Sequence, residues 1–207
     1  MTSISKGENI VNAFKVVIET YENVDKLMSY LKSQAVEKKE FICHTDKFLR
    51  WRTDNAPDGW LYTDFILVFQ DMNDKKLRKR WRDGPLYVFN VDFMTGDKEP
   101  IVYIARYDYE KISEWKWDVI SPADHGFFAD PLIDSSGIME YEYTNGGEEY
   151  VGKIKNKNNP KYKGLKSIQG IEVPLMDIDG QEKAYEIVFG GFKKLAEKGE
   201  LRMQEQV

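Results

Sequence analysis

Three segments of the chain alternate apolar and polar residues at every second position, and this pattern constrains the fold more than any other feature. They span residues 60–69, 86–94 and 101–109. Successive side chains of a β-strand point to opposite faces of the sheet, so each segment predicts a strand with one face against a core. Because the connections are short or medium, with a hairpin loop over 95–100, an antiparallel meander is favoured. A short strand over 48–52 extends it at the start.

An amphipathic helix is predicted over residues 8–35. Its apolar side chains are spaced alternately four and three residues apart, which places them on one stripe of a helix. The stripe consists of Ile10, Phe14, Val17, Tyr21, Val24, Met28 and Leu31, and Val11, Ile18 and Leu27 widen it. The β-branched residues within 14–20 leave a second interpretation open, in which a shorter helix begins near Val24. Two abutting helices would also satisfy the pattern.

The remainder of the chain predicts less regular structure. Proline and glycine breakers interrupt residues 110–140, and eleven acids against two lysines make 108–149 strongly acidic. Six lysines between 153 and 166 indicate a mobile basic segment. We therefore expect one α+β domain over 1–207: a helix (8–35) packed on an antiparallel meander sheet (46–109), an irregular acidic insert (110–149), a basic flexible segment (150–170), and a C-terminal strand and helix (171–207).

The composition indicates a soluble, cytoplasmic protein. Cys43 is the only cysteine, so no disulfide can form within the chain, which fits a reducing compartment. Neither a signal-peptide core nor an apolar run of membrane-spanning length is expected. The net charge of −5 and the pI near 5.3 disfavour a dedicated nucleic-acid-binding domain.

Arginine and tryptophan gather at two places and predict a binding surface. The tripeptide Arg-Trp-Arg occurs at 50–52 and again at 80–82, where it ends a run of six cations that begins at Lys75. Guanidinium groups beside an indole can stack, and they can pair with carboxylates or phosphates. The predicted binding residues are Arg50, Arg52, Arg78, Arg80, Trp81, Arg82 and Arg106. Trp81 is expected to be exposed and Trp51 to pack inward; the alternative is that these charges only solvate the surface.

Polar residues on the predicted meander are the best candidates for chemistry. We take Phe65, Phe89 and Tyr103 as the core face. The opposite face then carries Asp64, Asn90, Asp92, Arg106 and Asp108. Neighbouring strands lie about 4.8 Å apart, so these side chains are expected to cluster. Asp64 and Asp92 are candidate catalytic or metal-binding carboxylates, and His125 is a candidate base. The alternative is a solvent-facing sheet with cross-strand ion pairs.

Cofactor motifs are absent from the sequence. A structural zinc site is excluded because one cysteine and two histidines cannot supply four ligands. No cofactor is expected, although Mg²⁺ or Mn²⁺ held by carboxylates stays open. Asp58, Glu114 and Lys116 resemble in residue type the carboxylates and lysine of restriction-type nucleases, but three loosely spaced residues identify no family.

These observations favour an interaction protein, since no motif identifies a reaction. We expect a non-catalytic cytoplasmic protein that binds a protein or nucleic-acid partner with an anionic surface, and no membrane. The contact would be made by the arginine, tryptophan and basic surfaces. The alternative is a metal-dependent phosphodiesterase or nuclease that uses the sheet carboxylates Asp64 and Asp92.

Overall fold

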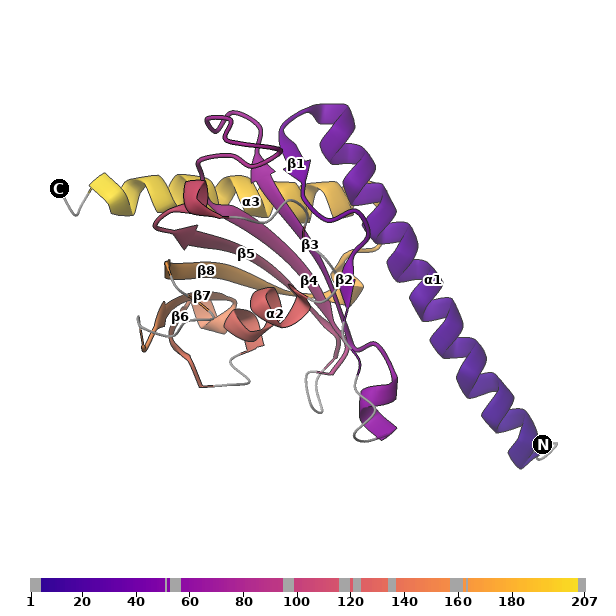
Figure 1. Cartoon of the computed structure of the whole chain (residues 1–207). Coiled ribbons are helices and arrows are strands. Elements are labelled where there is room, and N and C mark those ends of the chain that lie inside the picture. Colours follow the sequence, from indigo (N-terminus) through magenta and orange to yellow (C-terminus); the bar gives the residue numbers. More distant parts are fainter. Residues whose placement is uncertain are drawn as a thin grey trace.

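The computed structural model describes residues 5–50, 52, 57–94, 99–115, 120, 124–133, 137–156, 162 and 164–204. Its centre is an eight-stranded antiparallel sheet in the order β1-β3-β4-β5-β8-β7-β6, with β2 also paired to β3 (Figure 1). The strands are β1 (Phe41–Cys43), β2 (Leu49–Arg50), β3 (Asp64–Asp71), β4 (Leu86–Asp92), β5 (Ile101–Tyr109), β6 (Met139–Thr144), β7 (Glu149–Ile154) and β8 (Leu165–Pro174). The α-helices are α1 (Lys6–Lys38), α2 (His125–Ile133) and α3 (Gln181–Gln204). This confirms the predicted α+β class, with a helix at each end of an antiparallel sheet.

The N-terminal segment is one continuous helix, so the alternatives of a shorter helix from Val24 or two abutting helices are wrong. At its start the Ser5 hydroxyl accepts a hydrogen bond from the Glu8 amide (3.1 Å), and the Glu8 carboxylate accepts one from the Ser5 amide (2.7 Å). This reciprocal cap satisfies two amides that a helix start otherwise leaves unpaired. The helix ends where Lys39 turns to a left-handed φ of 55°.

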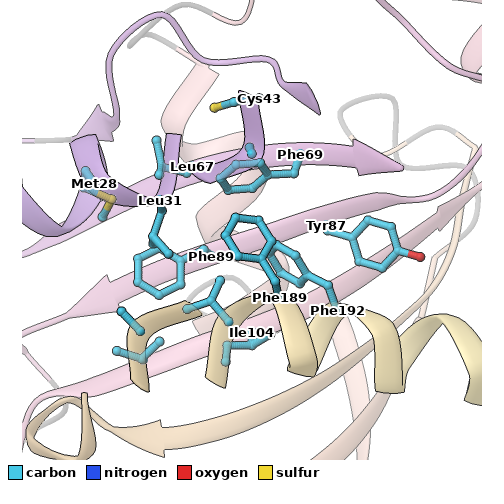
Figure 2. Close-up of a cluster of buried hydrophobic side chains, with 14 of the residues drawn as sticks. Met28, Leu31, Cys43, Leu67, Phe69, Tyr87, Phe89, Ile104, Phe189 and Phe192 are labelled. Atoms are coloured by element: carbon cyan, nitrogen blue, oxygen red, sulfur yellow. The ribbon is translucent and has the colours of Figure 1, made fainter. Parts of the chain in front are cut away.

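Helices α1 and α3 cover one face of the sheet (Figure 1). The larger aromatic core lies between these helices and that face (Figure 2). Phe189 and Phe192 of α3 meet Phe69 of β3 with ring centroids 5.7 and 5.6 Å apart. Gly191 lies against β5, since a Cβ there would be 3.0 Å from the Ile104 side chain. The absence of a side chain at Gly191 therefore allows the helix to approach β5 closely.

The other face of the sheet is also covered, which corrects the prediction of an irregular insert. Residues 110–149 contain a short 3₁₀ helix (Ile112–Glu114), helix α2 and the strand β6. Helix α2 forms despite Pro131, because it buries Phe128 and Leu132 against the sheet. The Tyr107 hydroxyl donates to the Phe128 carbonyl oxygen (2.6 Å) and ties α2 to β5.

The predicted basic flexible segment overlaps two strands. Most of β7 and the first half of β8 lie within 150–170, so that part of the prediction is wrong. Strands β6 and β7 form a hairpin around Asn145–Gly147. Residues 157–161 and 163, which carry much of the lysine run, lie outside the described residues. Among the residues that the structure describes, no helix is both long and apolar enough to cross a bilayer.

Candidate functional site

The connection between β3 and β4 folds into a small hairpin of its own, which we call the basic hairpin (Lys75–Asp83). The Leu77 amide donates to the Trp81 carbonyl oxygen (2.9 Å), and the Asp83 amide donates to the Lys75 carbonyl oxygen (2.8 Å). These two cross-strand bonds hold the run of cations in a defined shape.

A buried glutamine fixes the base of this hairpin. Gln70, at the end of β3, is fully buried, and its Nε2 donates to the carbonyl oxygens of Arg82 (2.9 Å) and Gly84 (3.0 Å). Its Oε1 accepts a hydrogen bond from the Arg82 amide (2.8 Å). A buried amide needs such partners, and here they lock the returning arm of the hairpin. No sequence signal distinguished Gln70 from any other strand residue.

Trp81 is buried, so the prediction that it is exposed is wrong. Its side chain is only 4% exposed and stacks on His44, with ring centroids 4.3 Å apart and planes at 15°. Trp115 packs edge-on against it at 5.3 Å. Burial, aided by the nearby Arg80 charge, lowers the pKa of His44 to about 4, so this imidazole is neutral at pH 7. Burying the large apolar surface of the indole is favourable, so the side chain packs inward and does not face solvent.

The cations of the basic hairpin point to solvent around this buried indole. Lys75, Lys76, Arg78, Lys79 and Arg80 are exposed, and Arg82 is half-buried. The Arg80 Nη2 donates to the Cys43 carbonyl oxygen (3.1 Å), while its Nη1 lies 3.8 Å from an Asp46 carboxylate oxygen. The predicted binding residues 78, 80 and 82 thus share one hairpin, with 78 at its outer turn.

The first Arg-Trp-Arg copy does not form a matching surface in the described residues. Arg50 is half-buried, and its guanidinium lies over the rings of Tyr62 (5.1 Å) and Phe48 (5.5 Å). A hydrogen bond from Arg50 lowers the pKa of Tyr62. Arg52 is exposed, and Trp51 lies outside the described residues.

Arg106 has a structural role rather than a place on the surface. It is 4% exposed, and its Nη1 donates to the carbonyl oxygens of Leu195 (3.2 Å) and Ala196 (3.0 Å) in α3. The same guanidinium pairs with Asp108 at 2.8 Å. Gly199 leaves room for it, since a Cβ there would lie 1.8 Å from Nη1. These bonds attach α3 to β5.

The three candidate catalytic residues lie together. Asp64, the first residue of β3, lies directly opposite Asp92, the last residue of β4. The Nε2 of His125, at the start of α2, contacts Oδ1 of Asp64. Asp92 and His125 are 8% and 5% exposed, so they are not on a solvent-facing sheet. Burial raises the pKa of Asp92, opposed by a hydrogen bond from the Met94 amide (2.8 Å), and the Asp64 charge raises it further.

The strand register changes the membership of this group. Asn90 pairs with Tyr103, and Arg106 pairs with Tyr87. Tyr103 therefore shares a face with the carboxylates, while Arg106 and Asp108 lie on the opposite, helix-covered face. The predicted cluster of five polar residues is wrong in these two members, because β5 pairs one residue out of the assumed register.

Asn90 is the unsatisfied member of the polar group. It is fully buried, and within the described residues neither its Oδ1 nor its Nδ2 has a hydrogen-bond partner. No set of three or more His, Cys, Asp or Glu side chains in the described part of the chain is arranged to hold a metal. Mg²⁺ usually keeps several waters and binds through one or two carboxylates, and here one of the two, Asp64, already contacts His125. We therefore assign no metal to this group.

A groove lies elsewhere in the described structure. An apolar groove of about 670 Å³ runs between α1 and the start of α3. Val24 and Leu27 line one side, with Leu175 and Ile178 on the other and Phe93 beneath. None of the residues predicted as a site lines it. Of the nuclease-like set, Glu114 pairs with Lys111 at 3.0 Å on the surface, and the Asp58 side chain and Lys116 lie outside the described residues.

Comparison with known proteins adds no family assignment: no family model, curated protein or solved structure matches the chain significantly.

Proposed function

We propose that the protein binds a macromolecular partner with an anionic surface, and that the basic hairpin makes the contact. The observation that carries this proposal is the display of five exposed cations on one hairpin of a chain with net charge −5. Charge gathered on one element attracts an oppositely charged surface even when the whole protein has the same sign as its partner.

Rigidity supports the proposal. Gln70 fixes the base, and Trp81 stacked on His44 attaches the hairpin to the rest of the protein. Side chains mounted on a fixed backbone lose less conformational entropy on binding than those on a flexible loop. Three of the cations, Lys75, Lys76 and Arg78, form no ion pair within the described residues, so a partner need not break one.

The chemistry of the contact follows from the position of Trp81. A buried indole offers no ring for stacking nucleobases, so the hairpin lacks the aromatic platform on which single-strand binding depends. The contact is then made by ammonium and guanidinium groups pairing with phosphate or carboxylate oxygens.

Charge reversal tests this proposal. The variant Lys76→Glu/Arg78→Glu changes two exposed cations whose side chains form no hydrogen bond or ion pair within the described residues, whereas Arg80 also holds the Cys43 carbonyl oxygen. The probes are a 20-base-pair DNA duplex and poly-L-glutamate, followed by fluorescence anisotropy at several salt concentrations. We expect tighter binding at low salt and a salt slope reduced by about two units in the variant, one for each lost phosphate contact.

The matched control is Lys153→Glu/Lys166→Glu, which changes net charge equally at two exposed lysines of β7 and β8. It should bind both probes as the unchanged protein does. Equal losses in the two variants, or no binding to either probe at low salt, would contradict the proposal.

A second candidate function is hydrolysis at the sheet carboxylates, favoured by the convergence of Asp64, Asp92 and His125. An Asp that contacts one imidazole nitrogen can orient the ring as a base. No metal-dependent step is assigned. Hydrolysis of bis(p-nitrophenyl) phosphate by the unchanged chain and by His125→Ala tests it: turnover that the substitution abolishes would favour this candidate over the first.

A further inference from the structure

The N-terminal part of α1 extends beyond the sheet that covers the rest of the helix (Figure 1). We call Lys6–Thr20 the overhang; at about 1.5 Å per residue it is roughly 22 Å long. Every residue from Ser5 to Val16 is exposed, and the first fully buried residue of the helix is Val24. Tyr21 marks the junction, since its hydroxyl bonds to the backbone of Tyr62 (2.9 Å).

The overhang is amphipathic although nothing in the described structure covers it. Ile10 is 61% exposed, Phe14 is 64% exposed and Ile18 is 56% exposed. Helical segments of about 12–15 residues are marginal in water without tertiary support. An exposed apolar face on such a segment is typical of a surface that is buried in an assembly.

A second apolar patch lies beside the junction. Trp60, Leu61 and Met94 are 59%, 45% and 61% exposed, and they flank the start of β3 and the end of β4. Because Asp64 pairs with Asp92, these residues share one end of the sheet, the end that α1 passes at Tyr21. The overhang and this patch together form what we call the apolar end.

We propose that the apolar end is the interface between two copies of this chain, which pair through antiparallel overhangs. The stripe from Ile10 to Leu31 repeats every seven residues, the spacing of a helix that packs along another helix. Its C-terminal half is used against the sheet. Its N-terminal half is exposed and can pack along another helix of the same length whose apolar stripe is also exposed. The overhang of a second copy is such a helix.

The antiparallel orientation follows from the position of the sheet. The stripe that would meet the second helix is continuous with the stripe that meets the sheet, so a parallel pair would bring two sheets into the same space. An antiparallel pair that sets Phe14 of one copy against Val17 of the other keeps the two stripes in contact. The first turn of each overhang then reaches the other copy's patch of Trp60, Leu61 and Met94.

Area and charge fit this occupant. Seven exposed large apolar side chains lie on the stripe and the patch: Ile10, Val11, Phe14, Ile18, Trp60, Leu61 and Met94. At on the order of 100 Å² each they approach the ~800 Å² per partner of a standard interface. The overhang carries Lys6 and Lys15 against Glu8 and Glu19, so two copies meet without net repulsion. A two-fold interface of this kind uses the same surface on both copies.

The test is sedimentation equilibrium of the full chain between about 1 and 100 μM, the range in which interfaces of modest strength dissociate. We expect a dimer for the unchanged chain and a monomer for Ile10→Asp/Phe14→Asp, whose side chains are exposed within one copy. Val36→Asp is the matched control, because Val36 is 77% exposed on the same helix but lies at its other end. It should leave the dimer intact.

Thermal melts at low concentration check that the double variant keeps its fold. The inference does not rest on the basic hairpin, so it stands or falls separately from the proposed function. A monomeric unchanged chain at 100 μM, or a dimer that survives Ile10→Asp/Phe14→Asp, would overturn it.

Discussion

The two halves of α1 carry the same pattern and have opposite surroundings. In the C-terminal half, Met28 and Leu31 are 1% and 0% exposed between the sheet and α3, whereas in the N-terminal half Ile10 and Phe14 are 61% and 64% exposed. Both halves belong to one capped helix without a break. Amphipathic spacing therefore determines which side of a helix is apolar, while the extent of the sheet determines how much of that side belongs to the core.

The largest expected difference between the two halves is in stability. Leu31→Ala should lower the free energy of unfolding by about 3 kcal/mol, because it leaves a cavity in the core. Ile10→Ala should lower it by less than about 0.5 kcal/mol in dilute solution, where its side chain faces water. Urea denaturation at about 1 μM measures both, a concentration chosen to keep association small. Similar losses at the two positions would mean that the overhang is already buried within one copy.

The junction at Tyr21 should show a smaller effect. Tyr21→Phe removes a hydroxyl that bonds to both the amide and the carbonyl of Tyr62 (2.9 Å each), at a cost of about 1 kcal/mol. Tyr30→Phe is the control, since the Tyr30 hydroxyl forms no hydrogen bond within the described residues. Denaturation of the two variants side by side would separate them. If both behave alike, the anchor does not lie at Tyr21.

A still smaller and more local effect is expected at the free end of α1. Ser5→Ala removes the cap and should destabilise the first turn by about 1 kcal/mol, with global unfolding almost unchanged. Amide exchange at Asn9, which donates to the Ser5 carbonyl oxygen (3.1 Å), reports on this turn. Ser33→Ala serves as control, because its hydroxyl bonds within the anchored half (2.7 Å). Unaltered exchange at Asn9 would show that the cap does not hold the turn.

The same turn should respond to acid. Hydrogen bonds from the Ser5 amide and hydroxyl lower the pKa of Glu8 from its usual 4.5. Since the folded pKa is lowered, the charged carboxylate stabilises the turn fully above pH 4.5, and that contribution is lost as the pH falls through the lowered value. Carbon chemical shifts of residues 6–9 should therefore lose helical character in acid, while those of 24–31 stay helical. In Glu8→Gln this pH dependence should disappear; its persistence would assign the effect to another group.

Much of the fold could be predicted from local pattern. The helix, the three long strands and the turn at Asn145-Gly146-Gly147 each carry a periodic or turn signal that neighbours do not override. Helix α2 was missed because its sequence, His125 to Ile133, is apolar nearly all round and contains Pro131, so no periodicity marked it. The prediction that Trp81 is exposed was wrong because six neighbouring cations suggested a solvent-exposed loop. In the structure the indole is buried against His44.

The candidate site was predictable only in part. Asp64, Asp92 and His125 were named from residue type and strand parity, and they do lie together. Arg106 was assigned to the same group, yet it faces α3. Asn90 was placed on the carboxylate face by strand parity, but its burial without a partner in the described residues was not foreseen. Gln70, which holds the basic hairpin, had no local signal.

The sequence by itself determined which residues share a face within each strand and within α1, because side-chain direction repeats every two residues in a strand and every 3.6 in a helix. Only the tertiary structure decided how those faces match. Pairing Asn90 with Tyr103 turned Arg106 toward α3, since a shift of one residue moves every side chain of a strand to the other face. The end of the sheet likewise decided where the apolar stripe of α1 passes from core to open surface. Strand pairing and the end of the sheet both depend on contacts between segments far apart in the sequence, and periodicity within one segment carries no information about such contacts.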